Sequence, residues 1–561
     1  MANIILTPVT LWKDFDESLP LDEEEISRKE ENGLICREVY YYGRQTRKGR
    51  VKIFARFVAP AGAEEYPAVM MLFEAGLPVD RKLVERFTSR GYAVLCVDYC
   101  GDDGTETFTV YPEDVDYANY ARAGRAMEYV DSTAKETSWY EWAAVARYSV
   151  RYLHEMPQVT RVGAIGIRTG GEILWKIAPY SELSCMIPVC AAGWIAYRNL
   201  DKFSDKAEQI FDEERHRFIA GIDSQSYAPY VKCPVLLLCA INDRKNNYDR
   251  AYDTFQRINP DVEKAILYSS RGNGLMGAHS MIDLNLFLDK YLKGRSVYVS
   301  GPADVSVGED GKGNLVAKCK FDEGGEIVDC GIFFTEEISD CSAREWTRIL
   351  AEEDDITDNA CTIPFSVYAG SDKALIYSFV NYSNGFSVTS KIKGVPLTKK
   401  YRNTVPRSRV IYNHTDGLNG FTPYRQRTRV VADCFVDDAS AVLELLPGYG
   451  GIAGISCELG LITYRVGESR YAAPDGANLQ FDVYSEQGAV CKAIFVRTEE
   501  ETKTLYTAEF KVKGGGKWKS EMFSPEEFKS DTGAPLSDFS QVDALIFLGE
   551  GKFVLNNIIW L

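Results

Sequence analysis

The sequence predicts a doubly wound α/β domain followed by two all-β sandwich domains. Up to about residue 295, continuous apolar runs typical of strands buried on both faces alternate with helical segments, which predicts a mainly parallel sheet with helices on both sides. Inside this region, Arg161 to Ile177 has the pattern of a strand that enters a tight glycine turn and leaves as a helix. After Lys293 the segments become short and alternate between apolar and polar residues, as in antiparallel sandwiches.

The first domain can be assigned element by element. Residues 1–60 are predicted to be β structure, with a hairpin that turns at Arg47 to Gly49. Residues 195–227, which are charged and aromatic, are predicted to form a helical lid over the sheet. Buried strands are predicted at 66–73, 91–98, 161–167, 185–194, 233–244 and 265–270, and helices at 79–89, 138–156 and 280–292.

The length of 561 residues is too great for a single hydrophobic core. The change of pattern at Lys293 and a polar stretch before residue 410 divide the chain into three predicted domains. They cover residues 1–295, with the lid at about 195–227, then 296–409 and 410–561.

The charge balance restricts the partners. With 64 basic and 81 acidic residues the net charge is -17, which disfavours binding to nucleic acid or to an anionic membrane, because both attract positive surfaces. A small-molecule or carbohydrate ligand is the expected partner, and a homo-oligomer is compatible with the sequence.

The cysteines and the N-terminal residues indicate the compartment. Fourteen cysteines include no CxxC pair, and several lie in apolar strand-like runs, which favours buried free thiols over a disulfide framework or a zinc site. The N-terminal segment has no basic region followed by an apolar core, and no apolar run approaches the length of a membrane span. We therefore expect a cytoplasmic protein without a cofactor or a bound metal.

The glycine turn carries the main functional signal. Gly166 and Gly170 occupy the two glycine positions of the G-x-S-x-G nucleophile elbow, where the backbone leaves no room for a Cβ. The central residue is Arg168, whose guanidinium stays protonated and offers only hydrogen-bond donors, so it cannot attack a carbonyl carbon. Thr169 carries a hydroxyl, but it lies one residue beyond the apex of the turn.

The first 295 or so residues resemble the α/β-hydrolase family, most closely its acetyl xylan esterase and dienelactone-hydrolase-like branches. The resemblance rests on the GIRTGG turn, on the run CPVLLLCAINDR, on Gly277 to His279, and on their order. It implies that Asp243 matches the acid and His279 the base, with the carboxylate orienting the imidazole. Taken singly, such residues are commonly structural, and a relative without its nucleophile could keep both for hydrogen bonding alone.

A second departure from the family pattern lies after the first buried strand. The loop there is Phe73 to Gly76, FEAG, where relatives commonly carry a His-Gly pair that helps to shape the oxyanion hole. Glu74 would repel the negative charge that develops on a carbonyl oxygen unless it pairs with a cation. We expect Arg168 to be that cation, and Glu74 and Arg168 to be the ligand-binding candidates.

The last domain resembles jelly-roll carbohydrate-binding modules through ANLQFDVYS, GGGKWKSEMFSPEEFKS and GKFVLNNIIWL. The resemblance implies a sandwich fold and a glycan-binding surface. Such sandwiches also join domains, and the 33 tyrosines and 8 tryptophans of the chain could equally fill their cores.

Two functional hypotheses follow. In the first, the protein is a non-hydrolytic pseudoenzyme related to carbohydrate esterases, which binds a glycan or another ligand, an anionic one if Arg168 holds it. In the second, it is an active carboxylic-ester hydrolase or a serine-independent enzyme that acts on acylated carbohydrates or small acyl substrates through the His279 and Asp243 pair. The direction of the Arg168 guanidinium discriminates between them, because a guanidinium that fills the cleft leaves no room for an acyl-enzyme.

Overall fold

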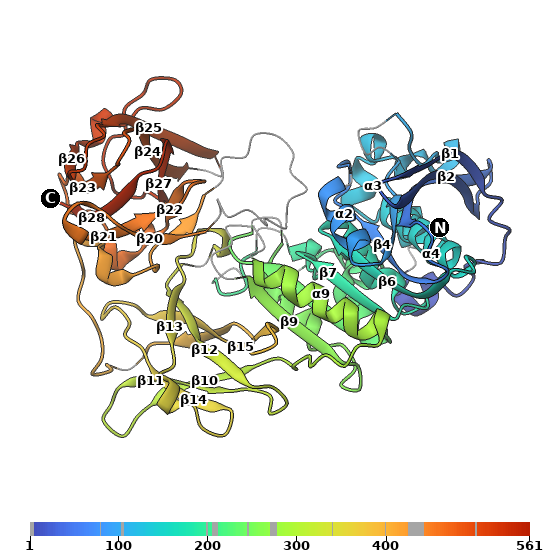
Figure 1. Cartoon of the computed structure of the whole chain (residues 1–561), viewed down its shortest axis with the longest axis horizontal. Coiled ribbons are helices and arrows are strands. Elements are labelled where there is room, and N and C mark those ends of the chain that lie inside the picture. Colours follow the sequence, from blue (N-terminus) through green and yellow to red (C-terminus); the bar gives the residue numbers. More distant parts are fainter. Residues whose placement is uncertain are drawn as a thin grey trace.

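The computed structural model covers the whole chain (Figure 1). The structure describes residues 5–78, 80–101, 106–197, 200–204, 211–243, 246–269, 278–338, 340–398, 400–424, 442–499 and 502–561, without the side chains of residues 278 and 279. Predictions that fall on other residues, among them Arg244 and Gly277, lie outside the described residues.

The first sheet has nine strands in the order β1-β2-β3-β5-β4-β6-β7-β8-β9. The first three are antiparallel and include the predicted hairpin, whereas β5, β4, β6, β7, β8 and β9 are parallel. The strands are β1 (Glu24–Glu31), β2 (Leu34–Gln45), β3 (Arg50–Pro60), β4 (Tyr66–Leu72), β5 (Ala93–Asp98), β6 (Val159–Ile167), β7 (Cys185–Val189), β8 (Val235–Ala240) and β9 (Lys264–Ser269).

Helices cover both faces of this sheet. Buried residues of α4 and α5 form one core with one face, and buried residues of α2 and α9 form another core with the opposite face. This arrangement confirms the predicted doubly wound fold. The helices are α1 (Pro8–Leu11), α2 (Arg81–Ser89), α3 (Arg125–Glu128), α4 (Ser138–His154), α5 (Thr169–Ile177), α6 (Glu213–Gly221), α7 (Ser224–Tyr227), α8 (Ala251–Phe255) and α9 (Ala278–Lys293).

Two local predictions are corrected by the backbone. Residues 1–60 are not all β structure, because Pro8–Leu11 forms a short helix with Pro8 in its first turn, a position that proline favours. The strand predicted over residues 185–194 ends at Val189, because Cys190 and Trp194 have positive φ angles of 51° and 64°, which no strand accommodates.

The middle part of the chain forms two antiparallel sheets that pack beside β9 (Figure 1). Thr389 Oγ1 accepts a hydrogen bond from the backbone N–H of Tyr268 in β9, and the ring of Tyr377 lies 5.5 Å from that of Tyr268. The sheets contain β10 (Asp304–Glu309), β11 (Leu315–Lys320) and β14 (Ala360–Pro364), and β12 (Ile327–Glu336), β13 (Thr347–Leu350), β15 (Lys373–Tyr382), β16 (Ser387–Thr389) and β17 (Lys393–Pro396).

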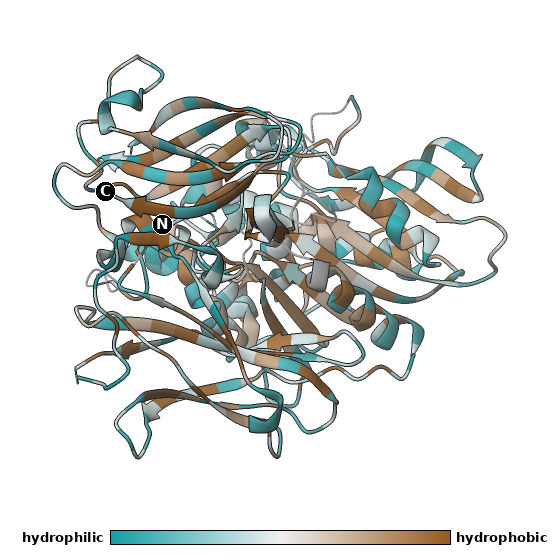
Figure 2. Ribbon diagram, turned by 60° about the vertical axis from the view of Figure 1, so that its left-hand side comes forward, coloured by the Kyte–Doolittle hydropathy of each residue, from teal (hydrophilic) through white to brown (hydrophobic). Residues whose placement is uncertain are grey.

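The last part forms a sandwich of two further antiparallel sheets around its own core, in which Phe481, Phe547 and Trp560 are fully buried. Figure 2 shows the hydrophobic residues concentrated along the strands. The sheets contain β18 (Val410–Tyr412), β20 (Glu444–Pro447), β21 (Ala453–Ser456), β23 (Leu479–Tyr484), β26 (Lys519–Phe523) and β28 (Val554–Trp560), and β19 (Thr422–Pro423), β22 (Leu461–Thr463), β24 (Ala489–Glu499), β25 (Thr502–Val512) and β27 (Ala544–Glu550).

The fold class predicted from the sequence is confirmed, whereas the domain boundaries and the lid stay predictions. Part of the proposed lid, residues 198–199 and 205–210, lies outside the described residues. In the part of the chain that the structure describes, no helix combines the length and the apolar character that a membrane crossing requires. None of the 13 cysteines that the structure describes forms a disulfide with another, and all but Cys36 are buried.

Candidate active site

The predicted elbow is formed by β6, Arg168 and α5. Arg168 has φ 51° and ψ -112°, a strained conformation for a residue with a Cβ, and the helix begins at the next residue. A Cβ on Gly166 would lie 2.5 Å from the carbonyl oxygen of Gly170, and a Cβ on Gly170 would lie 2.2 Å from that of Leu72. Both contacts are shorter than any real Cβ makes, so the turn requires glycine at both positions.

The guanidinium of Arg168 lies between two carboxylates. Its Nη1 donates to Asp243 Oδ1 at 3.1 Å and lies 3.0 Å from Oδ2, and its Nε lies 3.6 Å from Glu74 Oε2. The three residues come from the segments that follow β4, β6 and β8, at the carboxyl ends of parallel strands, where α/β sheets bring their functional groups together. The expected contact between Arg168 and Glu74 is present, and the shorter contact with Asp243 was not foreseen.

Burial strengthens the attraction between the charges of this cluster, because little water screens them. The side chain of Asp243 is 2% exposed, that of Arg168 10% and that of Glu74 18%. Asp243 follows Asn242, whose φ of 60° bends the chain directly after β8 and places the carboxylate at the elbow. A cation between two carboxylates at this depth is held firmly, since removing it would take away the positive charge that faces both of them.

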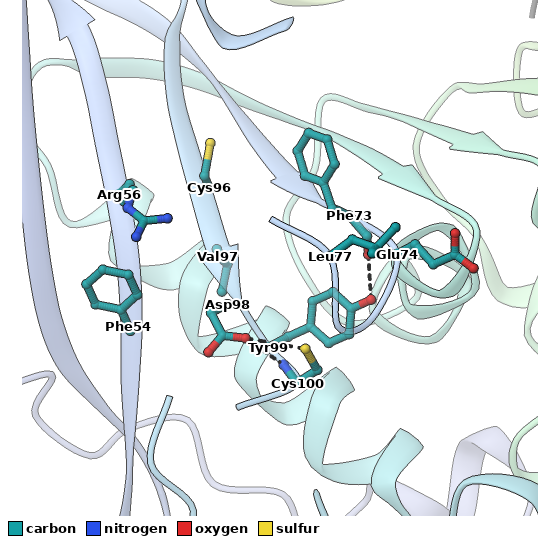
Figure 3. A pocket seen from close by; sticks show the side chains of 10 residues that line it. All are labelled: Phe54, Arg56, Phe73, Glu74, Leu77, Cys96, Val97, Asp98, Tyr99 and Cys100. Atoms are coloured by element: carbon teal, nitrogen blue, oxygen red, sulfur yellow. Dashed lines mark hydrogen bonds between the residues drawn. The ribbon is translucent and has the colours of Figure 1, made fainter. Parts of the chain in front are cut away.

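Glu74 borders a small cavity (Figure 3). The cavity has a volume of about 20 Å³, the space of roughly one water molecule. Tyr99 donates a hydrogen bond from its hydroxyl to the carbonyl oxygen of Phe73 at 2.5 Å and so fixes the backbone next to Glu74. In Figure 3 Glu74 and Arg56 of β3 lie on opposite sides of the group of lining residues, and the Glu74 carboxylate points away from Arg56.

The structure shows less of the surroundings of two other predicted site residues, Thr169 and His279. Thr169 is the first residue of α5 and is half-buried. His279 belongs to the first turn of α9, and its side chain lies outside the described residues, so its predicted contact with Asp243 stays a prediction.

A buried ionic group supports the elbow from below. Glu172 accepts hydrogen bonds from the N–H of Gly193, at 2.8 Å, and from the hydroxyl of Ser224, so α5 is fastened to two loops. Burial raises the pKa of Glu172, and burial lowers the pKa of Lys176 to about 8 although Glu172 opposes that shift. Asp223, whose pKa burial also raises, accepts from the backbone N–H of Trp194 at 2.7 Å.

Sequence reasoning missed the contribution of the middle sheets. The side chain of Asn242 donates to the carbonyl oxygen of Arg344 at 2.8 Å, and Arg344 is paired with Asp249. These partners are about a hundred residues apart, and no motif indicates such a pairing. Nearby, Asp201, Asp340 and Cys341 place potential metal ligands within 4.8 Å of one another among the described residues, but they include no feature beyond an acidic cluster and a thiol.

The arrangement limits the chemistry at the apex. Arg168 supplies hydrogen-bond donors and positive charge, and Glu74 and Asp243 supply acceptors and negative charge. The apex therefore offers polar recognition and electrostatic stabilisation.

Comparison with known proteins places this region in a family. Residues 53–263 match the family model described as the Dienelactone hydrolase family. A search of curated proteins gave no match. Among solved structures, an acetyl xylan esterase from Paenibacillus sp. R4 is 15% identical, with 48% of this chain and 89% of that chain covered and a TM-score of 0.36.

Two further structures show the same range of similarity. Acetyl xylan esterase 1 from a Thermoanaerobacterium species is 17% identical, with 46% of this chain and 85% of that chain covered and a TM-score of 0.36. An acylaminoacyl peptidase from Pyrococcus horikoshii is 13% identical, with 52% and 58% covered and a TM-score of 0.34. At these scores the assignment rests on the family match and on the sheet order. The chain therefore contains a dienelactone hydrolase family domain with the α/β-hydrolase fold.

Proposed function

We propose that this protein is a non-hydrolytic relative of the carbohydrate esterases, a pseudoenzyme that binds a ligand at the carboxyl ends of β4, β6 and β8. The observation that carries the proposal is the contact of Arg168, at the apex of the elbow, with Asp243 at 3.0 to 3.1 Å. An acyl-enzyme requires an activated hydroxyl or thiol at that apex and an acid that orients the base. In this chain Arg168 stands at the apex, and its guanidinium binds Asp243, the candidate acid.

The charges at the site favour a neutral, hydroxylated ligand. The positive charge of Arg168 is already shared by Asp243 and Glu74, so an anion would meet two carboxylates around one guanidinium. A sugar hydroxyl, in contrast, both donates to carboxylates and accepts from a guanidinium. We therefore infer an uncharged carbohydrate or acylated sugar as the ligand class.

The test uses the parent protein, with acetyl xylo-oligosaccharides and p-nitrophenyl acetate as substrates and a serine-directed organophosphonate as the probe. We expect turnover at the background rate and no adduct on the peptide that contains residues 161–176. A Thr169→Ala variant is the control, because an adduct that disappears in it would identify Thr169 as the nucleophile and refute the proposal. Turnover that survives Thr169→Ala and is abolished by Asp243→Asn would favour a serine-independent hydrolase.

Ligand binding is tested separately by isothermal titration with neutral and with uronic-acid oligosaccharides. The proposal predicts heat from the neutral series that is lost in Arg168→Met. Binding of the acidic series alone would contradict the inferred ligand class.

The C-terminal sandwich supplies a second surface for a carbohydrate. A groove of about 910 Å³ lies along β25 and β26 and is lined in part by Trp518 and Met522. Trp518 is held in place by the hydrogen bond from its indole N–H to the carbonyl oxygen of Tyr449 at 3.1 Å, so its ring is available as a rigid stacking surface. We assign the glycan-binding role of this domain to the groove, and Trp518→Ala should abolish retardation in gels that contain soluble polysaccharide.

A further inference from the structure

A turn of the middle sheets reaches the loop that carries Asp243. The thiol of Cys341 lies 3.9 Å from the carbonyl oxygen of Asp243, and the carbonyl oxygen of Cys341 accepts from the hydroxyl of Tyr248 at 2.7 Å. The side chain of Asn242 donates to the carbonyl oxygen of Arg344. Asn242, Asp243 and Tyr248 are thus joined to residues 341–344 by hydrogen bonds that run in both directions.

The strongest of these contacts is an ion pair. Arg344 Nη1 and Nη2 donate to the two oxygens of Asp249 at 2.6 and 2.7 Å, and both side chains are 0% exposed. The Arg344 Nε donates to the carbonyl oxygen of Ile338 at 2.9 Å, so all three nitrogens of the guanidinium have partners. Such a two-point pair fixes orientation as well as distance, which a lysine ammonium cannot do.

The turn itself is anchored on its other side. The carboxylate of Glu345, next to Arg344, accepts from the backbone N–H of Tyr464 in the C-terminal sandwich at 3.2 Å. Asn419 contacts Arg348 twice through its side chain. Arg344 therefore projects from a backbone that is tied to two other parts of the chain, and it is a rigid support.

The contacts form a continuous route from Arg344 to Arg168. Arg344 holds Asp249 through its guanidinium and Asn242, which follows β8, through its carbonyl oxygen. Asp243 lies directly after Asn242 and binds Arg168. Displacement of the loop would move the Asp243 carboxylate and lengthen its contact with the apex of the elbow.

We propose that Arg344 is a positioning residue for the candidate active site, where it holds the loop of Asp243 against Arg168 from the middle sheets. This inference rests on the proposed function only in taking the Arg168 cleft as the functional site. It assigns the middle sheets a role that the hydrolase fold alone does not require. On this proposal, Asp243 keeps its contact with Arg168 only when the middle sheets pack against the first domain.

The experiment measures the state of Arg168 directly. Phenylglyoxal modifies solvent-accessible arginines, and mass spectrometry of peptides gives the rate at Arg168 relative to the rate at Arg81, whose side chain is 83% exposed. In the parent, modification of Arg168 should be slow, because its side chain is 10% exposed and paired. In Arg344→Lys and in Asp249→Asn we expect its relative rate to rise about tenfold, the ratio that corresponds to about 1.4 kcal/mol.

The matched control is Arg44→Lys, which replaces the two-point pair of Arg44 with the fully buried Glu141, in the same domain, by a single ammonium contact. It should lower the melting temperature without changing the relative rate at Arg168. A purely structural role for Arg344 predicts that same result for Arg344→Lys, a lower melting temperature and an unchanged rate, and this result would overturn the proposal.

A milder variant provides the test if neither Arg344→Lys nor Asp249→Asn folds. Asn242→Gly keeps the positive φ and removes the hydrogen bond to Arg344. It should raise the relative rate at Arg168, and an unchanged rate in this folded variant would also overturn the proposal. The measurement requires neither a ligand nor turnover, so it stays decisive if the proposed function is wrong.

Discussion

Replacing Arg168 by serine would place a hydroxyl at the position that we assign to the nucleophile, and it would at the same time remove the cation from a carboxylate pair. The variant leaves Asp243, 2% exposed, and Glu74, 18% exposed, without the guanidinium that now lies between them. We expect it to fold, because Gly166, Gly170 and the strained turn between them are unchanged. We expect it also to be less stable than the parent.

The size of the loss follows from burial. Removing one partner of a buried ion pair costs about 3 to 5 kcal/mol. Because Arg168 and Glu74 keep some access to water, the lower end of that range applies, about 3 kcal/mol. Relief of backbone strain does not offset this cost, since a serine at φ 51° and ψ -112° is strained in the same way as an arginine.

A double-mutant cycle with Glu74→Gln separates the two carboxylates. Glu74→Gln alone should cost about 0.5 kcal/mol, because its contact with Arg168 is 3.6 Å long and partly exposed. In the Arg168→Ser background the same change removes a negative charge that repels Asp243 and no longer faces the guanidinium, so the double variant should be more stable than additivity predicts, by about 1 kcal/mol. It should also be the better esterase of the two serine variants, because a carboxylate no longer faces the developing oxyanion.

The assay is urea unfolding of the four proteins together with initial rates on short-chain acyl sugars and aryl esters. A stability change within 0.5 kcal/mol for Arg168→Ser would refute the view that the guanidinium neutralises the buried carboxylates. Four folded proteins that are equally inert would show that the site has changed beyond its elbow.

Three further predictions can be checked independently. Because burial lowers the pKa of Lys176 to about 8, the unfolded chain binds this proton more tightly than the folded chain; the free energy of unfolding should therefore gain about 2 kcal/mol from this group between pH 8 and pH 10, and urea unfolding of Lys176→Met should lack that gain. Gly170→Ala should destabilise the fold by more than about 3 kcal/mol or prevent soluble expression, because its Cβ would lie 2.2 Å from a backbone oxygen, and a matched Gly311→Ala control, whose Cβ would meet nothing within 4 Å, should express normally. Peroxide should join Cys330 and Cys361, whose sulfurs are 3.9 Å apart in the middle sheets, with loss of two titratable thiols; peptide mapping that finds both still reduced would contradict this.

Most of the fold was predictable because its signals are local. Continuous apolar runs predicted the strands of the parallel sheet, and alternation predicted the hairpin of β2 and β3. The strand after the elbow was predicted too long, because positive φ angles at Cys190 and Trp194 leave no trace in hydropathy. The short helix at Pro8 was missed for a similar reason, since four residues are too few to show a helical period.

The sequence by itself determined that an arginine stands at the apex of a glycine elbow and that a glutamate stands in the loop after the first parallel strand, since spacing along the chain defines both positions. Only the tertiary structure decided the partners. Arg168 contacts Asp243, 75 residues away, more closely than it contacts Glu74, and Asp249 is paired with Arg344, 95 residues away. Local sequence cannot select among distant charges, because the choice depends on which carboxylates packing removes from water, and that is settled only when the strands and the three parts of the chain come together.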